Sequence, residues 1–499
     1  SSGASLGVAL FTLGMPLLGI SASSVWWGGI GAVGAAWVGA ATILLIIMAV
    51  TTRIKDIMAI LIMGMMFGSA ATAIVEILQY MSPEGAVKSY VVWTMGSLGG
   101  VLLSELRILV PVLAAGLALS VSLIKPLNML LLGENYARTM GLDIRATRLR
   151  IFASTILLAG TVTAYCGPIS FLGLAVPHIV RMAFREADHR ILMPASMVCG
   201  GGIAAAVLRH DAADKHRYRL HRHPRCHRGD IPHTQKRLKM EYERINTVQL
   251  HGLTLGYRDR VLFTDAGIGF GWGEFTALIG RNGTGKSTLL RTIAGLSRPL
   301  AGHITVNGRR TDEMSRREIA ATIAFVSTEE VKVENLKVSD VVALGRAPYT
   351  NWVGSLTEND RAKVTHALAL VGMQEFTAKG IDTLSDGERQ RVMIARALAQ
   401  DTPIILLDEP TAFLDLPNKY EIGLLLRRLA HDEGKCIVFS THDLAIALEL
   451  CDTIALLEGG RFHYGTTDML VESGDLGRLF RDTALTFDPD TRSVRLRGE

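Results

Sequence analysis

The sequence has 499 residues, of which 49% are hydrophobic and 20% are charged, and its mean hydropathy is +0.29. One hydrophobic core rarely grows past roughly 250–300 residues, so at least two domains are expected. Long apolar stretches dominate before about residue 208, whereas charged residues become frequent after residue 240. This split excludes a single soluble domain and predicts a membrane part joined to a soluble part.

The net charge of +5 comes from one short segment. Positions 209–239 hold ten basic and three acidic residues, so the rest of the chain carries a net charge of −2. A basic surface for nucleic acid is therefore not expected. The cysteines have no paired spacing, which argues against a disulfide framework or a zinc ribbon. They are Cys166, Cys199, Cys226, Cys436 and Cys451.

Six apolar runs in the first 208 residues have nearly the length of about 20 residues that crosses a hydrocarbon layer of about 30 Å. Two shorter stretches, Val91–Leu103 and Ile169–Met182, are predicted to be half-helices or tilted spans. No cleavable signal is expected, since residue 1 already lies inside the apolar pattern. The six predicted spans are Ala4–Ile20, Trp27–Val50, Ile57–Tyr80, Ile108–Ile124, Ile151–Cys166 and Ile191–Leu208.

Basic residues between the runs predict the orientation of this part. They cluster at Arg53 and Lys55, at 138–150 and at 181–190, while the loops at 21–24 and 81–88 hold a single lysine. The positive-inside rule places the three basic loops in the cytoplasm.

Several strings in this half resemble one family, the permease subunit of type II ABC importers, which take up cobalamin, haem and ferric siderophores. The resemblance covers residues 1–208 and implies that Leu127–Ile144 forms short cytoplasmic coupling helices that press on an ATPase. From composition alone the less favoured alternative for the same stretch is a polar surface helix in a basic loop. The family pattern also implies that its first two spans and its closing span are missing here. The strings are Ser2 to Gly7, Trp93 to Leu98, Leu132 to Gly141, Gly167 to Leu174 and Val176 to Arg181.

Residues 209–239 are too charged to span a membrane, because each charge at mid-bilayer costs several kcal/mol. Three interpretations compete: a basic, disordered tether, a metal site built on the histidines between His221 and His227, and an out-of-frame translation that joins two genes. The predicted topology leaves residue 209 outside, one crossing short of the cytoplasm, and Met240 is placed like an initiator. We therefore favour a frameshift between a truncated permease and its ATPase.

A phosphate-binding loop follows a predicted buried strand, Phe275–Ile279. Positions 280–287 match G-x4-G-K-[ST], in which glycines let backbone N–H groups surround phosphates at the start of a helix. Lys286 would neutralise the β- and γ-phosphates, and Ser287 would bind Mg²⁺. The remaining predicted ATP-binding residues of this segment are Gly280, Asn282, Gly283, Gly285 and Thr288.

A second predicted strand, Ile404–Leu407, ends in two carboxylates. Asp408 is expected to hold Mg²⁺ and Glu409 to polarise the attacking water. Between the two motifs, Leu384 to Gln390 resembles the signature motif of ABC ATPases, although an ordinary capping box is the simpler alternative.

The signature resemblance implies that ATP lies between two copies of the ATPase, contacted by Ser385, Gly387 and Glu388. Asp386 replaces the usual glycine and Glu388 the usual glutamine, and Arg389 would have to offset the added negative charge. Four further positions follow from the family. Tyr257 would stack on adenine, His442 would bond the γ-phosphate, Asp415 would link the two ATP sites, and Thr328 stands where a glutamine normally senses the metal.

The predicted fold class is thus an N-terminal all-α membrane bundle (1–208), a basic junction (209–239) and a C-terminal α/β P-loop NTPase (240–499). The latter has a RecA-like core, an antiparallel β subdomain and a helical subdomain with helices at Val338–Leu344, Glu358–Val371 and Gly387–Ala399. The predicted function is ATP- and Mg²⁺-dependent import of an iron chelate, haem or cobalamin across the cytoplasmic membrane, with the ATPase on the cytoplasmic side.

The expected partners are a second copy of the ATPase and permease, an external substrate-binding protein and the lipid bilayer, and no nucleic acid. A soluble ABC ATPase without a transport role, for example in DNA repair or translation, and an ABC exporter remain the alternatives.

Overall fold

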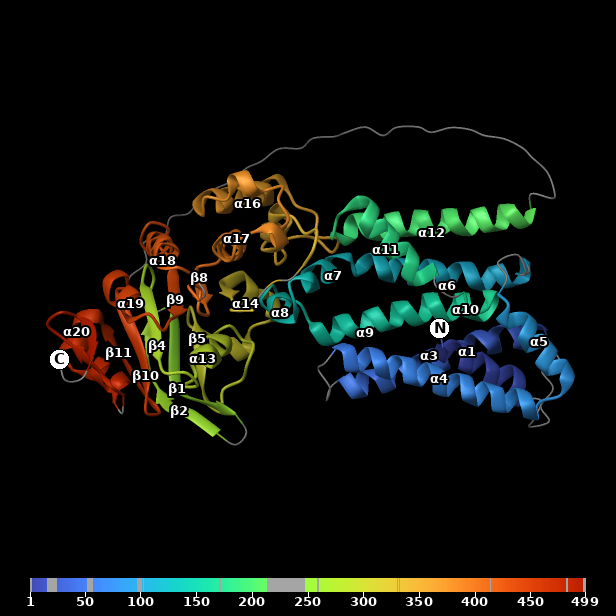
Figure 1. Cartoon of the computed structure of the whole chain (residues 1–499), viewed down its shortest axis with the longest axis horizontal. Coiled ribbons are helices and arrows are strands. Elements are labelled where there is room, and N and C mark those ends of the chain that lie inside the picture. Colours follow the sequence, from blue (N-terminus) through green and yellow to red (C-terminus); the bar gives the residue numbers. More distant parts are fainter. Residues whose placement is uncertain are drawn as a thin grey trace. The chain divides into compact units, whose positions relative to one another are not determined.

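The computed structural model of the chain (Figure 1) divides into two compact units. The helical unit comprises Ser1–Ile124 and Arg145–Arg225, and the sheet unit comprises Lys125–Ile144 and Cys226–Glu499. The structure describes residues 2–15, 25–51, 57–96, 101, 103–169, 172–212, 247–257, 260–329, 331, 333–412, 414–481 and 483–496. Arg53, Lys55, the loop at 21–24, Met240 and nearly all of the 209–239 junction lie outside these ranges.

The helical unit contains helices throughout its described residues. Two of its helices contain a short π-helical segment, η1 (Leu10–Gly14) and η2 (Ile156–Gly160). The α-helices are α1 (Ser2–Ala9), α3 (Val25–Thr51), α4 (Ile57–Met81), α5 (Glu84–Thr94), α6 (Leu103–Ser122), α9 (Ile144–Thr155), α10 (Thr161–Cys166), α11 (Leu172–Phe184) and α12 (His189–Ala212).

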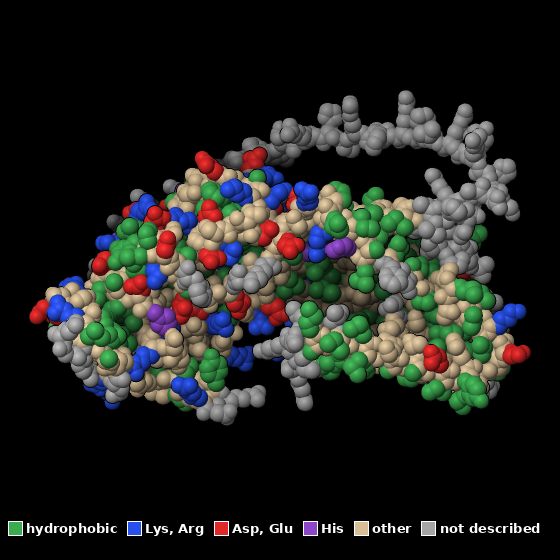
Figure 2. All heavy atoms as spheres, in the orientation of Figure 1, with side chains coloured by type: hydrophobic (Ala, Val, Ile, Leu, Met, Phe, Trp, Pro, Cys, Tyr) green, Lys and Arg blue, Asp and Glu red, His purple; other side chains and the backbone are tan. Residues whose placement is uncertain are grey.

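Three segments among the described residues are long and apolar enough to cross a membrane: Ile62–Met81, Leu103–Ser122 and Ile144–Cys166. Ser2–Gly14, Gly31–Ile47 and Leu172–Phe184 are shorter apolar helices. Apolar side chains such as Met65, Met66 and Ile77 of α4 face outward, and Figure 2 shows many others on the visible face of this unit. An exposed apolar helix surface is what a lipid environment favours.

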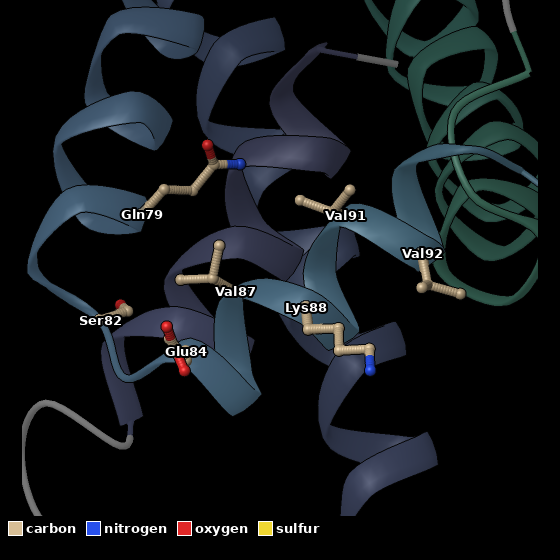
Figure 3. A pocket seen from close by; sticks show the side chains of 7 residues that line it. All are labelled: Gln79, Ser82, Glu84, Val87, Lys88, Val91 and Val92. Carbon is tan, nitrogen blue, oxygen red and sulfur yellow. The ribbon is translucent and has the colours of Figure 1, made fainter.

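The predicted half-helix at Val91–Leu103 is wrongly placed, because the helix here, α5, begins at Glu84 and ends at Thr94. Pro83 precedes it with extended backbone and Glu84 occupies its first turn, two features that favour a helix start. A cavity of about 530 Å³ lies between the end of α4 and one side of α5 (Figure 3). Its charged lining residues, Glu84 and Lys88, are one helical turn apart.

Small residues let α1 approach α3 closely. A Cβ atom added to Gly7 would lie 2.0 Å from the carbonyl oxygen of Ala35, and one added to Gly39 would lie 2.2 Å from that of Gly3. Neither position therefore accepts a side chain, as expected where helices associate through backbone contact.

A six-stranded sheet with strand order β11-β10-β4-β9-β8-β7 forms the centre of the sheet unit. Only β11 runs antiparallel to its neighbour, and β4, β7, β8 and β9 are buried at every position. Strands buried on both faces are typical of a parallel sheet covered by helices. The strands are β4 (Phe275–Gly280), β7 (Ile323–Val326), β8 (Ile404–Leu407), β9 (Cys436–Ser440), β10 (Thr453–Glu458) and β11 (Arg461–Thr466).

A second sheet of the unit is antiparallel, with strand order β2-β1-β5-β6 and β3 paired to β1. Its strands are β1 (Val248–Tyr257), β2 (Arg260–Ala266), β3 (Gly269–Phe270), β5 (Ala301–Val306) and β6 (Arg309–Arg310). A hairpin of β12 (Leu485–Asp488) and β13 (Ser493–Leu496) follows near the C-terminus.

The helices of the sheet unit include a separate group of three, α15 (Val338–Leu344), α16 (Glu358–Leu370) and α17 (Asp386–Ala399), within one residue of the predicted bounds. Together with the two sheets, this group confirms the predicted fold class of the C-terminal half. The other helices are α13 (Lys286–Ile293), α14 (Arg316–Thr322), α18 (Leu416–His431), α19 (Leu444–Leu450) and α20 (Thr467–Glu472), with short 3₁₀ turns η3 (Thr311–Glu313), η4 (Gln374–Phe376), η5 (Ile381–Thr383) and η6 (Asp475–Phe480).

Two short helices that precede the β strands in sequence also belong to the sheet unit. They are α7 (Ile124–Leu131) and α8 (Glu134–Thr139), within the segment that the family resemblance assigned to coupling helices. Arg316 of α14 donates to the carbonyl of Leu142 at 3.2 Å, and Gly141 lies against the same helix. The predicted permease range of 1–208 therefore contains a stretch that packs with the sheets.

Candidate nucleotide-binding site

The phosphate-binding loop joins the end of β4 to the start of α13. Gly283 and Gly285 have φ of 78° and 109°, a region that favours glycine, and Gly285 is the N-cap of α13. Lys286 is only 5% exposed, and its Nζ donates to the carbonyls of Gly280 at 2.8 Å and Arg281 at 3.3 Å. Burial lowers the pKa of Lys286, while the carboxylates of Glu409 and Asp408 oppose that shift. The lysine charge is thus held inside the loop.

Ser287 and Asp408 meet beneath the loop, although they are far apart in sequence. Ser287 Oγ donates to Asp408 Oδ1 at 2.8 Å, and Ser440 Oγ donates to the same oxygen at 2.8 Å. Asp408 is 1% exposed and follows β8, while Ser440 ends β9. A hydroxyl and a carboxylate at one point provide the oxygen ligands that Mg²⁺ prefers.

Glu409 and His442 lie at the edge of the same cluster. His442 Nε2 is 3.0 Å from Glu409 Oε1, and both side chains are partly exposed. The N–H of Glu409 donates to Ser440 Oγ at 2.8 Å. Glu409 has a φ of 48°, which is uncommon for a residue other than glycine and is found at functional sites. Ser440 therefore fixes the carboxylate of Asp408 through its hydroxyl proton and the backbone of Glu409 through an oxygen lone pair.

Tyr257 lies at the end of β1, and its hydroxyl is 3.0 Å from Thr288 Oγ1 on α13. The ring is 65% exposed, so one face is accessible to a flat partner. Asn282 is exposed in the loop itself. The structure thus brings Tyr257 and Thr288 together beside the phosphate-binding loop.

Arg281 ties the loop to the C-terminal part of the sheet unit. Its Nε donates to the carbonyl of Leu479 in η6 at 2.9 Å, and its guanidinium also donates to the carbonyl of Arg481. These bonds join residues about 200 positions apart in sequence.

The signature-like segment begins α17 with a complete capping box. Ser385 is the N-cap, and Glu388 returns its side chain to the backbone of Ser385 at 2.8 Å, so the simpler alternative of a capping box is present. Arg389 forms an ion pair with Asp386 at 2.9 Å. Arg389 therefore compensates the charge added by Asp386 within one helical turn, as we expected from the sequence. Gly387 lies within van der Waals reach of Leu414 and Asn418.

Asp415, predicted to link two ATP sites, caps α18 in this structure. Its carboxylate accepts from the backbone N–H of Asn418 at 3.2 Å and from the side-chain amide of Asn418 at 2.6 Å. This contact gives Asp415 a structural role at the N-terminus of α18.

The loop after β7 and the start of α17 share a cavity of about 320 Å³ in the sheet unit. Thr328 and Glu409 both line it, so a residue of the expected glutamine loop lies near the predicted catalytic carboxylate. The other lining residues are Tyr136, Ser327, Glu329, Val331, Asp386, Arg389, Gln390, Met393 and Ala412.

Tyr136 of α8 forms the buried side of this cavity. Its hydroxyl donates to the carbonyl of Ser327 at 2.9 Å and accepts from the N–H of Ser327 at 3.2 Å. Beneath it, the guanidinium of Arg396 lies 4.9 Å from the ring centroid, and Arg396 is fully buried. Burial raises the pKa of Tyr136 and lowers that of Arg396 to about 10. Within the part of the chain that the structure describes, Arg396 donates to one carbonyl, that of Phe325, and the aromatic face further stabilises this cation.

Sequence reasoning missed four residues of this site: Ser440, Arg281, Tyr136 and Arg396. Ser440 lies two positions before the predicted site residue His442, and this proximity was a usable signal. Tyr136 and Arg396 meet only through the fold. Their helices, α8 and α17, are also linked by Gln400 at the end of α17, which donates to the carbonyl of Thr139 at 3.4 Å.

Comparison with known proteins places this site in a family. Residues 1–208 match the FecCD transport family, and residues 263–412 match the ABC transporter family. An uncharacterized ABC transporter ATP-binding protein of Methanocaldococcus jannaschii is 38% identical over 234 residues, 47% of this chain and 81% of that protein. The chain belongs to the ABC transporter family. This ABC transporter chain therefore hydrolyses ATP, and its FecCD region makes it a membrane transporter.

Two further relatives of this ABC transporter chain have assigned substrates. The iron(3+)-hydroxamate import ATP-binding protein FhuC of Bacillus subtilis is 38% identical over 249 residues, which is 50% of this chain and 93% of FhuC. The achromobactin transport ATP-binding protein CbrD of Dickeya dadantii is 42% identical over 239 residues, which is 48% of this chain and 89% of CbrD.

Proposed function

We propose that this chain imports an iron chelate, haem or cobalamin across the cytoplasmic membrane, with ATP hydrolysis on the cytoplasmic side. The observation that carries the proposal is the FecCD match at residues 1–208 on the same chain as an ATP-binding cassette. The names of FhuC and CbrD favour an iron chelate among the three substrate classes.

In the proposed site, the loop at 280–287 binds the nucleotide phosphates. Lys286 supplies the buried charge, and it exchanges its bonds to the loop carbonyls for phosphate oxygens. Tyr257 offers its exposed ring to the adenine.

Ser287 and Asp408 are the residues that fit Mg²⁺, because their oxygen atoms already lie 2.8 Å apart. A bound magnesium ion would neutralise charge on the phosphates. Thr328 is the further candidate ligand, since it lines the cavity that Glu409 shares.

Glu409 is the proposed general base. It accepts a hydrogen bond from His442 or from a water, and Ser440 holds its backbone in the unusual left-handed conformation. His442 would keep the carboxylate oriented and contact the γ-phosphate. In this proposal Glu409 would polarise the water that attacks the γ-phosphate.

A complete site requires two copies of the chain. Ser385, Gly387 and Glu388 begin α17, whereas the phosphate loop begins α13, and the proposal places the signature residues of one copy over the nucleotide of the other. Asp415 would link the two sites. The proposed assembly also includes an external substrate-binding protein and the lipid bilayer.

Uptake by liposomes containing the full chain tests the proposal. Labelled ferric hydroxamate, haem and cobalamin are supplied outside, with a binding protein from the same genome, and ATP is enclosed. ATP-dependent accumulation of one substrate, lost in Glu409→Gln, is the expected result. ATP hydrolysis without uptake of any of the three would overturn the import proposal.

The exporter alternative is distinguished by the direction of transport. An exporter in the same liposomes would move substrate toward the side opposite the ATPase, whereas a soluble ABC ATPase would not fractionate with membranes. The apolar segments Ile62–Met81, Leu103–Ser122 and Ile144–Cys166 favour a transporter over the soluble alternative.

A further inference from the structure

The loop after β7 has Thr328 where the family has a glutamine. The next residue, Glu329, contacts two other elements of the sheet unit. Threonine ends one carbon beyond Cβ, so it reaches less far than the usual glutamine. Glu329 has a longer side chain, and its N–H donates to Ser327 Oγ at 3.1 Å. This bond fixes the backbone from which the Glu329 carboxylate projects.

The Glu329 carboxylate contacts two different elements through the same oxygen. The amide of Asn135 on α8 donates to Oε1 of Glu329. Arg291 on α13 places its guanidinium 3.7 Å from the same Oε1. One carboxylate oxygen therefore joins a helix of the 125–144 segment to the helix that begins at the phosphate-binding loop.

Arg291 is well placed to affect the nucleotide. It lies one helical turn after Ser287, and α13 spans only eight residues, Lys286–Ile293. A displacement of Arg291 would therefore move the short helix α13, whose first residues contact the phosphates in the proposed site. At the other end of the link, Asn135 belongs to α8, a helix of six residues, Glu134–Thr139.

We propose that Glu329 is a positioning residue that couples α8 to the phosphate-binding helix α13 through Asn135 and Arg291, in place of a glutamine at position 328. The inference rests on the proposed function, because it concerns how movement of the membrane part reaches the ATP site. In this proposal the Arg291–Glu329 ion pair does the coupling that the glutamine side chain does in the family.

The chemistry of the link gives it a recognisable signature. The side chains of Arg291 and Glu329 are 38% and 45% exposed, so their attraction is modest and is screened by salt. A purely structural contact, such as side-chain packing, lacks this salt dependence.

Steady-state ATP hydrolysis by the full chain in liposomes tests the link. The variants are Asn135→Ala, Glu329→Ala, their double mutant and Glu329→Gln, which keeps an acceptor for Asn135 but removes the charge. Glu313→Gln is the matched control, since it removes one exposed carboxylate 3.7 Å from Arg310 on an unrelated surface. KM for MgATP and kcat are measured at low and high NaCl concentrations.

The expected result is a KM for MgATP raised about 2- to 5-fold in Glu329→Ala and Glu329→Gln at low salt, with a smaller ratio at high salt. Asn135→Ala should raise KM in the parent and have no further effect in Glu329→Ala, because the two residues act through one contact. Glu313→Gln should match the parent.

Additive effects of Asn135→Ala and Glu329→Ala, or effects that are independent of salt, would overturn the inference while leaving the proposed function intact. A parent chain that neither binds nor hydrolyses MgATP would overturn both together.

Discussion

Two buried cations in the sheet unit lie in contrasting surroundings. Lys286 is 5% exposed beside the carboxylates of Asp408 and Glu409, and its hydrogen bonds go to loop carbonyls that a phosphate can replace. Arg396 is fully buried, donates to the carbonyl of Phe325 at 2.6 Å and lies under the ring of Tyr136. Burial lowers the pKa of both groups. The difference teaches that a buried charge bonded to exchangeable loop carbonyls is suited to binding a ligand, whereas a buried charge under a fixed ring packs structural elements together.

The largest expected effect concerns the ligand-binding side of this comparison. Glu409→Gln should lower kcat for ATP hydrolysis about 10²- to 10⁴-fold, because the proposed general base is lost, while ATP affinity is retained. Hydrolysis rates and binding of a fluorescent ATP analogue measure the two quantities separately. The exposed Glu433→Gln is the control. Unchanged hydrolysis in Glu409→Gln would remove this residue from the role of base.

A third buried cation, Arg346, sharpens the comparison because its partner is a buried carboxylate. It contacts Asp360 at 2.8 Å, with both side chains 5% exposed. Burial raises the pKa of Asp360, but hydrogen bonds from Thr357 and Arg346 outweigh it, so the pKa lies below the ordinary value. Asp360→Asn should therefore destabilise the sheet unit by about 3 kcal/mol at neutral pH.

The pH dependence of that effect has a definite sign. Asp360 has a depressed pKa in the folded state, so its contribution is present above the unfolded pKa and is lost as pH falls through the folded pKa. The difference in melting temperature between the parent and Asp360→Asn should shrink on acidification below the ordinary carboxyl pKa. A difference that grows at low pH would contradict this account, and the exposed Asp432→Asn should show no change.

A smaller effect is expected at the contact between Tyr136 and the buried Arg396. Tyr136→Phe removes the hydroxyl that bonds the N–H and carbonyl of Ser327, at a cost of about 1–2 kcal/mol in unfolding free energy, but keeps the ring over Arg396. Thermal melting of the full chain measures the change. Tyr349→Phe is the matched control, since its hydroxyl is 3.5 Å from its acceptor and its side chain is 40% exposed. Equal shifts for the two variants would show that the Ser327 contact is energetically unimportant.

The smallest expected effect tests whether the hydrogen bonds of Arg281 affect the ATP affinity of the loop at 280–287. Arg281→Ala removes the bonds from the phosphate-binding loop to the carbonyls of Leu479 and Arg481. ATP should then bind about 2- to 5-fold more weakly, because the loop is less well ordered before binding. Titration with the fluorescent ATP analogue measures this, with the exposed Arg298→Ala as control. Unaltered affinity would confine Arg281 to a structural role.

The sequence predicted which residues of the candidate phosphate site would lie together, and there is a physical reason for this. Lys286 and Ser287 lie in one contiguous loop, and Asp408 and Glu409 end one strand, so local geometry alone brings each pair together. Their approach to each other follows from the parallel sheet, in which the carboxyl ends of β4 and β8 lie at one edge.

The contacts of Tyr136 and Arg396 were not predictable in this way. Tyr136 and Ser327 are 191 positions apart, and Arg396 lies inside a helix whose sequence gives no sign of complete burial. The start of α5 at Glu84 was missed because its outer residues are polar enough to resemble a loop. Periodicity identifies an element, but it does not identify the partner that an element meets.

The burial of Tyr136 has a practical consequence for work on the ATPase alone. A protein that begins at Met240 lacks α8, so Arg396, which is fully buried in the full chain, would lose the Tyr136 ring that covers it. The carbonyl and N–H of Ser327 would face solvent as well. Basal turnover measured on such a fragment would describe a cassette that lacks the contacts of both Tyr136 and Asn135.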